Sequence, residues 1–584
     1  MRFKFTILIF VIVSSIIIYR LFDLTVISHN HYRELSSSNI IKNENIAPVR
    51  GEILDRNGKL LALNRMGFKI SIRPHLSKAQ LKEAVFLLKK SLNIDSLKII
   101  ENYQKKNLFY NNKPIKVISF VEYQRVMPHY TRIDLHENIE IEPTYKRFYP
   151  YDYVASHIVG YVAKTNRKEA KNDKTAKLNG FIGKSGIEKF YNSYLQGKRG
   201  FRTIKVTALN REVEVLNYKQ ALQNRDIKLS IDIELQQYLS KIFRNISAVA
   251  IIMKNDGEIL GLGSYPEYNP NSFVKGLSSK EWNRIKDDIR NPFTNKAVNG
   301  LYPPASTVKG AVGLSFLNSE KIGIDTYFHC DSNLKVGKRV FRCWKGSGHG
   351  ETNLNKAIRE SCDDYFYKGS LQVGIDNLSK DLKRYGFGQK TGIDLPNEFI
   401  GTMPDRQWKK RKHKSSWYIG ETLNTSIGQG YLLSTPIQIA QITALIATGK
   451  RVRPHFTEVN RAIIDILTDD EVKNLSHIQK AMWEVANHKK GTATKHLKLN
   501  SGIEIAGKTG TAQVISIPQN VKQRLNESEM AIFKRSHSWF TTYAPYKEPK
   551  FIVTVLLEHG GHGGKSVSPY ISKIYNKLQE MGYL

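Results

Sequence analysis

The sequence predicts an α/β fold: an α/β sandwich in the C-terminal part of the chain, preceded by a mixed α+β region and one membrane-spanning helix. Three observations predict it. An apolar stretch opens the chain, strand patterns occur at both ends of the region after residue 225, and many helical stretches lie between them. Such an order is typical of a sheet that unites distant segments. At 584 residues, the chain is also too long for a single core.

The N-terminus predicts a membrane anchor. Residues 1–4 are basic, and residues 5–27 are almost wholly apolar, interrupted mainly by Arg20 and Asp23. At about 1.5 Å of rise per residue, this stretch is long enough to cross a bilayer core of roughly 30 Å. No A-x-A-like cleavage site follows, which favours an uncleaved helix over a signal peptide. Positive charge at the extreme end predicts a cytoplasmic tail at 1–4, with the rest of the chain outside.

The net charge is +36, from 89 Lys and Arg against 53 Asp and Glu. A basic chain can signal nucleic-acid binding, but these residues are scattered along the sequence and no nucleic-acid-binding motif accompanies them. We therefore exclude nucleic acid as a partner and interpret the charge as solvated surface that favours anionic lipid headgroups. Hydrophobic residues make up 41% and charged residues 24%, as in a globular protein.

Residues 28–225 carry architectural signals rather than chemistry. Asn57 and Gly58, between two apolar runs, predict a β-hairpin. Ser185 and Glu188 have the spacing of a capping box and predict the start of a helix. We therefore assign this region to a non-catalytic pedestal domain and place the main domain boundary at about residue 225.

Residues 226–584 supply the α/β domain. The patterns predict a strand running into a helix at Asp232 and a hairpin that turns at residues 255–257. They also predict two C-terminal strands, 538–544 and 551–558, followed by a helix from about Ser568.

The stretch LYPPASTVKG, Leu301–Gly310, places a hydroxyl and an amine at the start of an apolar helix. Two prolines precede the serine, and proline is tolerated in the first helical turn because its missing N–H would be unpaired there. Ser306 and Lys309 are three residues apart and therefore share one face of that turn. Such a pair suits a nucleophile and its base.

Two further motifs follow Ser306. Ser361-Cys362-Asp363 begins 55 residues later, and Lys508-Thr509-Gly510-Thr511 begins 202 residues later. S-x-x-K, S-x-N/D and K-T-G in this order form the motif set of penicillin-binding enzymes.

Both outer motifs have a second copy in the chain. Ser332 to Lys335 repeats S-x-x-K in a polar segment expected to be a loop, and Lys390-Thr391-Gly392 repeats K-T-G between glycines and a proline. We interpret both copies as chance. The Lys508 copy instead lies in alternating apolar sequence, as expected of an edge strand that binds an extended peptide.

The residue types suit acyl transfer. Burial and a second cation such as Lys508 would favour the neutral amine of Lys309, which could then take the proton of Ser306. Ser361 could relay a proton between Lys309 and the leaving amine. Lys508 and Thr509 would offer a charge and a hydroxyl to a substrate carboxylate, and backbone N–H groups of Ser306 and residue 511 would form an oxyanion hole.

Over nearly its whole length the chain resembles class B penicillin-binding proteins, and among them the elongation-type penicillin-binding protein 2 group. The segments that carry the resemblance are RGEILDRNG, RFYPYDYVASHIVGYV, GKSGIEKFY, NGLYPPASTVKG, CWKGSGHG, TSIGQGYLLSTPIQIA, AGKTGTAQV and TTYAPYKEP. The resemblance implies a transpeptidase domain of the penicillin-binding and serine β-lactamase fold, an antiparallel sheet flanked by helices, on an elongated pedestal.

The resemblance also implies an activity, a D,D-transpeptidase that cross-links peptidoglycan stem peptides through an acyl-enzyme on Ser306 and is inactivated by β-lactams. It implies no catalytic cofactor, and it implies a single-pass protein of the bacterial inner membrane. The implied partners are a membrane glycan polymerase of the shape–elongation–division family and a periplasmic elongation scaffold. The implied site residues are Ser306, Lys309, Ser361 and Lys508 for catalysis, and Asp363, Thr509, Gly510 and Thr511 for substrate binding.

Two positions depart from the family pattern. Many relatives have asparagine where Asp363 stands, although elongation-type members often carry aspartate. Ala305 stands where glycine is common before the serine, and alanine should be tolerated there if its φ is negative.

All three cysteines lie close together in sequence with one histidine among them: Cys330, Cys343, His349 and Cys362. An oxidising exterior would permit a Cys330–Cys343 disulfide that leaves Cys362 free. Three thiols and one imidazole also suit tetrahedral Zn²⁺, and some relatives similar to this chain carry a zinc between the first two motifs. Buried thiols without a metal are the third interpretation. We favour a structural zinc site over the disulfide and over buried thiols, and expect it to fix Cys362 and thereby its neighbour Ser361.

Two other classes of function share these motifs. A D,D-carboxypeptidase or β-lactamase hands the acyl group to water, but such a hydrolase needs neither a membrane anchor nor a long pedestal. A β-lactam-sensing receptor would need more membrane spans, and a pure scaffold would be expected to lose some of the three motifs. The sequence therefore favours the cross-linking enzyme.

Overall fold

The computed structural model describes residues 2–111, 113–207, 212–222, 225–515 and 527–584. The chain forms two compact units, each assembled from segments that are separate in sequence. The first unit comprises Met1–Gly51, Lys164–Ile182 and Ser193–Arg225; the second comprises Glu52–Ala163, Gly183–Asn192 and Asp226–Leu584.

The first unit begins with the predicted apolar helix. It runs as α1 (Arg2–Phe22) and continues as a short π-helix (Asp23–Ile27). Within the described part of the chain, the segment Phe3–Ile27 is the one helix long and apolar enough to cross a membrane. Three antiparallel strands form a sheet in the order β1-β8-β9. The unit's further elements are α2 (His29–Ile40), β1 (Ile41–Ile46), α8 (Arg167–Asn172), α9 (Lys174–Asn179), β8 (Gly200–Val206) and β9 (Glu212–Lys219).

The N-terminal part of the second unit is built around one long strand, β3 (Leu60–Ile72), which pairs with β2, β4 and β5. The predicted hairpin at Asn57 and Gly58 is confirmed: it joins β2 to β3, and Gly58 has φ +82°, a conformation that glycine adopts without strain. Helices α3 and α4 cover the sheet with a buried apolar core. The elements here are β2 (Ile53–Leu54), α3 (Lys78–Leu92), α4 (Ser96–Gln104), β4 (Ile115–Glu122), α5 (Tyr123–Val126), α6 (Tyr130–Asp134), β5 (Ile139–Phe148), α7 (Ser156–Val159) and β10 (Ile227–Lys228).

The predicted capping box at Ser185 and Glu188 is wrong, although a short helix, α10 (Gly186–Phe190), does begin there. Ser185 makes no side-chain cap. Glu188 is fully buried, accepts a hydrogen bond from Arg147 Nε at 2.6 Å and another from the Tyr149 hydroxyl at 3.1 Å. A buried guanidinium needs an acidic partner, and this tertiary demand outweighs the local capping preference.

A five-stranded antiparallel sheet forms the centre of the C-terminal part of the second unit, in the order β12-β11-β21-β20-β19. The predicted hairpin at 255–257 is confirmed, because β11 pairs with β12 on either side of it. The predicted union of distant strands is confirmed too, because β11 pairs along its whole length with β21. The Lys508 strand, β19, lies at the edge as predicted. The strands are β11 (Ala248–Lys254), β12 (Ile259–Tyr265), β19 (Ala506–Ala512), β20 (His537–Ala544) and β21 (Phe551–Leu557).

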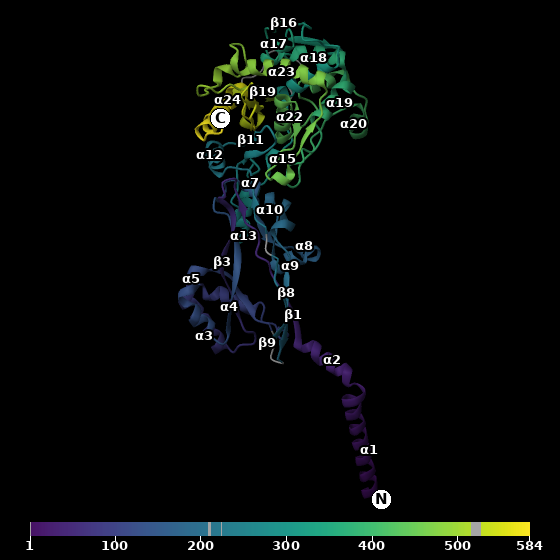
Figure 1. Ribbon diagram of the computed structural model, residues 1–584, viewed down its shortest axis with the longest axis vertical. Helices are drawn as coiled ribbons and strands as arrows, with labels where there is room; N and C mark the ends of the chain where they lie inside the picture. The colour runs from purple at the N-terminus through teal and green to yellow at the C-terminus, as the bar shows by residue number, and fades with distance from the viewer. Residues whose placement is uncertain (1, 112, 208–211, 223–224, 516–526) are drawn as a thin grey trace. The chain divides into compact units, whose positions relative to one another are not determined.

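Helices cover both faces of this sheet (Figure 1). Thr541 contacts Thr443 of α22 through their hydroxyls at 2.7 Å, whereas Thr542 contacts Tyr575 of α24 at 2.9 Å. Successive residues of a strand point to opposite faces, so α22 and α24 lie on opposite sides. The helices named here are α12 (Ile233–Phe243), which lies beside α24, α22 (Pro436–Thr448) and α24 (Gly563–Glu580).

The last helix begins five residues earlier than expected, at Gly563 rather than about Ser568. A Cβ added at Gly563 would lie 2.2 Å from the carbonyl oxygen of Gly510. The glycine therefore lets the helix start directly against β19, a tertiary contact that no sequence pattern reveals.

A second layer of helices carries the first two motifs. Its centre is α16 (Lys309–Asn318), which is buried from Lys309 to Leu317 and packs against α18, α19 and α23.

The α-helices and strands of the chain not yet named are β6 (Val162–Lys164), β7 (Phe181–Gly183), α11 (Asn192–Leu195), α13 (Pro270–Lys275), α14 (Ser279–Lys286), α15 (Lys296–Asn299), β13 (Phe328–Cys330), β14 (Asn333–Val336), β15 (Arg339–Arg342), β16 (Gly350–Thr352), α17 (Leu354–Arg359), α18 (Asp363–Val373), α19 (Ile375–Tyr385), α20 (Arg406–His413), α21 (Ile419–Ser426), β17 (Lys450–Val452), β18 (Ile463–Asp465) and α23 (Asp469–Asn487).

Candidate active site

The candidate nucleophile stands at the start of a buried helix, as predicted. Ser306 lies in a 3₁₀ turn, Ala305–Val308, that leads directly into α16 at Lys309. The condition for tolerating Ala305 without strain is not met: its φ is +49°, a left-handed conformation that is strained for alanine. The Ala305 N–H donates to the Gly428 carbonyl at 2.8 Å, and a Cβ at Gly428 would lie only 2.2 Å from the Ala305 oxygen. Close packing against Gly428 therefore holds the residue before the serine in this conformation.

The segment that leads to Ser306 is fixed by the sheet. The Trp539 indole N–H donates to the Pro303 carbonyl at 3.1 Å, and the Tyr302 hydroxyl donates to Glu558 at 2.7 Å. A Cβ added to Gly510 would come within 3.3 Å of the Pro304 oxygen. The glycine of the third motif thus favours the close approach between β19 and the nucleophile turn, because a side chain there would push the neighbouring atoms apart by a few tenths of an ångström.

Lys309 is fully buried and binds the second motif. Its Nζ donates to Asp363 Oδ1 at 2.8 Å and to the Ser361 carbonyl and hydroxyl oxygens at 3.0 and 3.4 Å. The other carboxylate oxygen of Asp363 accepts from the Trp344 backbone N–H at 3.0 Å. The residue predicted to bind substrate is therefore, in this structure, the counter-ion of the predicted base.

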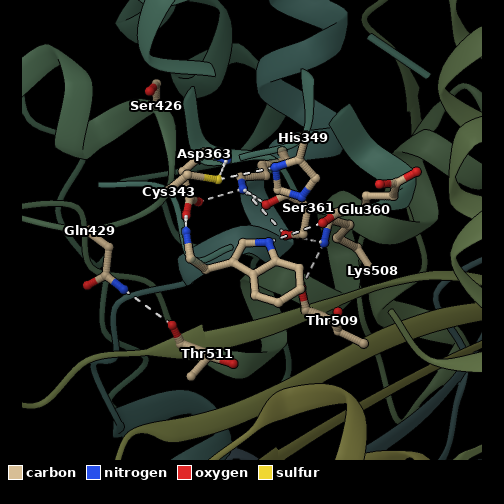
Figure 2. Close-up of polar contacts among 12 residues, drawn as sticks. Cys343, His349, Glu360, Ser361, Asp363, Ser426, Gln429, Lys508, Thr509 and Thr511 are labelled. Carbon is tan, nitrogen blue, oxygen red and sulfur yellow. Dashed lines mark hydrogen bonds and ion pairs between the residues drawn. The ribbon is translucent and has the colours of Figure 1, made fainter. Parts of the chain in front are cut away.

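Lys508 reaches the same serine from the sheet. Its Nζ donates to the Ser361 hydroxyl at 2.9 Å and to the Thr509 carbonyl at 3.1 Å (Figure 2). Burial lowers the pKa of Lys508 well below its ordinary value, and the neighbouring charge of Lys309 lowers it further. Ser361, held at φ +56°, thus places its hydroxyl between two amines.

Six of the eight residues predicted for catalysis and substrate binding line one cleft of about 1000 Å³, whose walls include Ser306, Ser361 and Asp363 on the helical side. Lys309 and Lys508 are fully buried and reach the cleft through Ser361. Thr509, Gly510 and Thr511 of β19 line the other side. The Thr509 hydroxyl contacts the Thr492 hydroxyl at 2.7 Å, and the Thr511 hydroxyl accepts from the Gly563 N–H at 3.1 Å. The three motifs are therefore brought together as the sequence predicted.

Beside the second motif lies the cysteine and histidine cluster. The ligand atoms of Cys330, Cys343, His349 and Cys362 all lie within 4.8 Å of one another, and all four residues are buried. His349 Nδ1 lies 3.6 Å from Cys330 Sγ and 3.4 Å from Cys343 Sγ. All three cysteines are free thiols, so the structure does not contain the Cys330–Cys343 disulfide of the alternative interpretation.

Comparison with known families decides the assignment. A model described as "Penicillin binding protein transpeptidase domain" matches residues 247–576, and one described as "Penicillin-binding Protein dimerisation domain" matches residues 45–229. The chain belongs to the penicillin-binding protein transpeptidase family. Similar curated proteins include "Peptidoglycan D,D-transpeptidase MrdA" of Haemophilus influenzae, 33% identical over 96% of this chain and 89% of the relative. The protein of the same name from Escherichia coli K12 is 32% identical over 94% of this chain and 90% of the relative.

Solved structures agree with the family assignment. This penicillin-binding protein is similar to penicillin-binding protein PBP2 of Helicobacter pylori, solved in complex with MreC, with a TM-score of 0.86 and 42% identity over 93% of this chain and 99% of that chain. It is also similar to Pseudomonas aeruginosa PBP2, with a TM-score of 0.66 and 29% identity over 91% of this chain and 96% of that chain.

The second copies of the motifs in this penicillin-binding protein lie outside the cleft. Ser332 lies in the bend directly before β14, as expected, whereas Asn333 to Lys335 lie on that strand and not in a loop, with Lys335 exposed. Thr391 donates its backbone N–H and its hydroxyl to Glu398, both at 2.6 Å, which makes that copy part of a loop. The described residues that line the cleft include neither copy.

Several residues of the site were not predicted. Trp344 binds Asp363, Trp539 binds the segment before the nucleophile, and Asn424 and Gln429 line the cleft. The Gln429 amide donates to the Thr511 carbonyl at 3.4 Å (Figure 2). Gly428 offered a signal, since glycine beside such a site indicates close backbone approach. The tryptophans offered none, because their roles depend on tertiary contacts.

Proposed function

We propose that the protein is a peptidoglycan D,D-transpeptidase that cross-links stem peptides through an acyl-enzyme on Ser306. One observation supports this most strongly: the Ser361 hydroxyl lies between the amines of Lys309 and Lys508 in the cleft that Ser306 lines. A hydroxyl in this position can pass a proton between the base and a leaving amine. The family assignment and the names of the curated relatives favour the same activity.

The proposed reaction has two steps, acylation of Ser306 and transfer to the acceptor. The Ser306 oxygen attacks the carbonyl carbon of the penultimate D-alanine, and Lys309 takes the serine proton. The peptide bond to the terminal D-alanine breaks, and the proton passes through Ser361 to the leaving amine. Asp363 stabilises Lys309 while it carries the proton. The amine of an acceptor stem peptide then attacks the ester carbonyl carbon and passes a proton through Ser361 and Lys309 to the Ser306 oxygen. The ester bond breaks, which forms the cross-link and frees Ser306.

The edge strand β19 would bind the donor peptide as an added strand, with its terminal carboxylate near the hydroxyls of Thr509 and Thr511. Gly510 keeps the strand close to the nucleophile turn. A β-lactam presents its strained amide and its carboxylate to the same groups. The predicted result is a stable acyl-enzyme and loss of activity.

We further propose that Cys330, Cys343, His349 and Cys362 hold a structural Zn²⁺. Zn–S and Zn–N bonds of about 2.3 and 2.05 Å in a tetrahedron place sulfur and nitrogen ligands about 3.6 Å apart. The observed separations of 3.6 and 3.4 Å fit this value. The Asp363 backbone N–H donates to Cys343 Sγ at 3.3 Å, so an occupied site would also hold the counter-ion of Lys309 in place.

The remaining assignments extend the family pattern. Residues 1–4 would be a cytoplasmic tail, 5–27 a single inner-membrane span, 28–225 a non-catalytic pedestal and 226–584 a periplasmic transpeptidase domain. The Helicobacter pylori relative was solved in complex with MreC, and we propose a similar scaffold as a partner here, together with a membrane glycan polymerase during lateral elongation.

Fluorescent-penicillin labelling of the detergent-solubilised full chain tests the assignment. We expect Ser306→Ala to abolish labelling, whereas Ser332→Ala, at the second S-x-x-K copy, keeps it. Lys508→Ala should reduce labelling strongly, and Lys390→Ala, at the second K-T-G copy, should not. Labelling that persists in Ser306→Ala would refute the proposal. Analysis of products from a donor and an acceptor peptide then separates a cross-linking enzyme from a carboxypeptidase.

A further inference from the structure

A hairpin beside the cleft has no part in the mechanism described above. It consists of β14 and β15, which pair from Asn333 opposite Arg342 to Val336 opposite Arg339. All four residues of β15 line the cleft, and two of them are arginines. The hairpin therefore presents two guanidinium groups at the wall of the site where the stem peptide would bind.

The charge of the cleft is unbalanced. Among the described residues that line it, the side chains with a full positive charge are Arg339, Arg342 and Lys565, and the carboxylates are Asp363 and Glu527. Asp363 is already paired with Lys309 at 2.8 Å. Glu527 accepts from the backbone N–H and the hydroxyl of Ser536 at 2.9 and 2.6 Å. The cations thus outnumber the acidic groups, and a cleft lined by one sign of charge concentrates ligands of the opposite sign.

The hairpin is held in a defined position. At its base, the Cys343 N–H donates to the Ser332 carbonyl at 2.7 Å. On its strand, the Phe341 ring contacts the Tyr367 ring with centroids 5.8 Å apart. The same ring lies so close to Gly420 that an added Cβ would be 2.8 Å from it. A recognition group on a fixed element binds a ligand with a smaller entropic cost than one on a free loop.

We propose that Arg339, with Arg342 beside it, binds a second carboxylate of the donor stem peptide, upstream of the scissile D-Ala-D-Ala bond. This inference rests on the proposed transpeptidase function and names a substrate feature for it. A guanidinium is the side chain best suited to a carboxylate, because its planar donors can bind both oxygens at once. The subsite is separate from the terminal-carboxylate position at Thr509 and Thr511, which β19 provides.

The test uses two synthetic donor peptides that end in D-Ala-D-Ala. They differ only in the side chain of the preceding residue, which ends in a carboxylate in one peptide and in a carboxamide in the other. We measure kcat/KM for release of D-alanine by the full-length protein in detergent, and acylation by benzylpenicillin, which lacks a second carboxylate.

We expect the carboxylate peptide to be preferred by about tenfold, the value of one charge-assisted hydrogen bond. Arg339→Gln should remove most of this preference, and the Arg339→Gln, Arg342→Gln double variant should remove all of it. Arg339→Lys should restore part, and rising salt should weaken the preference of the wild type. Arg284→Gln, which removes an exposed arginine on α14 outside the cleft, should leave the preference unchanged.

Three outcomes would overturn the inference: equal use of both peptides by the wild type, equal loss of both in Arg339→Gln, or an effect confined to transfer onto an acceptor amine. The last would place the carboxylate on the acceptor. Failure of the proposed function looks different, because the wild type would then not be acylated by benzylpenicillin at Ser306. Normal benzylpenicillin acylation of Arg339→Gln shows that the variant is folded.

Discussion

Replacing Lys508 with methionine should make the protein more stable and less active. Lys508 is fully buried, and its Nζ donates hydrogen bonds to the Ser361 hydroxyl at 2.9 Å and to the Thr509 carbonyl at 3.1 Å. Neither partner is a carboxylate, so the desolvation of its charge is poorly offset. Methionine has a similar shape and carries no charge. We therefore expect the variant Lys508→Met to gain roughly 1–4 kcal/mol of unfolding free energy.

The same change should slow acylation. The Ser361 hydroxyl loses a charge-assisted donor, which is worth about 1.5–3 kcal/mol. We expect this bond to act in the transition state, so the acylation rate constant for benzylpenicillin should fall by about 10- to 100-fold. A variant with both effects would show that Lys508 serves function at a cost in stability, as expected for a site under selection for chemistry.

The pH dependence has a definite sign. Burial, together with the charge of Lys309, lowers the pKa of Lys508 in the folded state, while the unfolded value is about 10.4. Between these two pKa values the unfolded chain binds more protons than the folded chain, so unfolding free energy rises with pH. The wild type therefore loses stability relative to Lys508→Met as pH falls from about 10.4 to the lowered pKa, and the difference is constant below it.

Calorimetry of the full chain in detergent at several pH values measures this difference, and stopped-flow acylation measures the rate. Lys390→Met, at the exposed second copy of the motif, is the matched control and should change neither quantity. A Lys508→Met variant that is less stable than the wild type at neutral pH would refute the reasoning. So would one that is acylated at the wild-type rate.

Three further predictions follow from particular contacts. Arg147→Met and Glu188→Gln should each lower the unfolding free energy by about 3–5 kcal/mol, because each leaves one partner of a buried ion pair without the other. The double variant should lose less unfolding free energy than the two single losses added together. Additive losses in a double-mutant cycle would contradict this. Trp539→Phe should slow benzylpenicillin acylation by roughly threefold to tenfold, since it removes the hydrogen bond to Pro303 while keeping an aromatic ring; an unchanged rate would count against a positioning role. Cys343→Ser should lower the zinc content of the purified protein from about one ion per chain towards zero, measured by elemental analysis; a wild-type protein without zinc would reject the metal proposal.

The sequence alone predicted the parts of the molecule that depend on local chemistry. The apolar N-terminal helix, the hairpin at Gly58, the union of distant strands in one sheet and the edge strand that carries Lys508 all followed from periodicity and turn residues. The three motifs identified the candidate site because their residue types and order are those that the proposed chemistry needs. The close approach of the four cluster residues followed from their isolation in sequence.

Contacts between distant segments decided the rest. Glu188 has the spacing of a capping residue, yet its carboxylate pairs with the buried guanidinium of Arg147. Ala305 takes a positive φ because Gly428 packs against it, and Asp363 binds Lys309 because two helices bring them together. Local patterns report what a segment favours by itself. The tertiary structure decides which partner a buried charge or a strained backbone segment contacts. The reason is that an unpaired polar group in the core costs more free energy than a local conformational preference contributes.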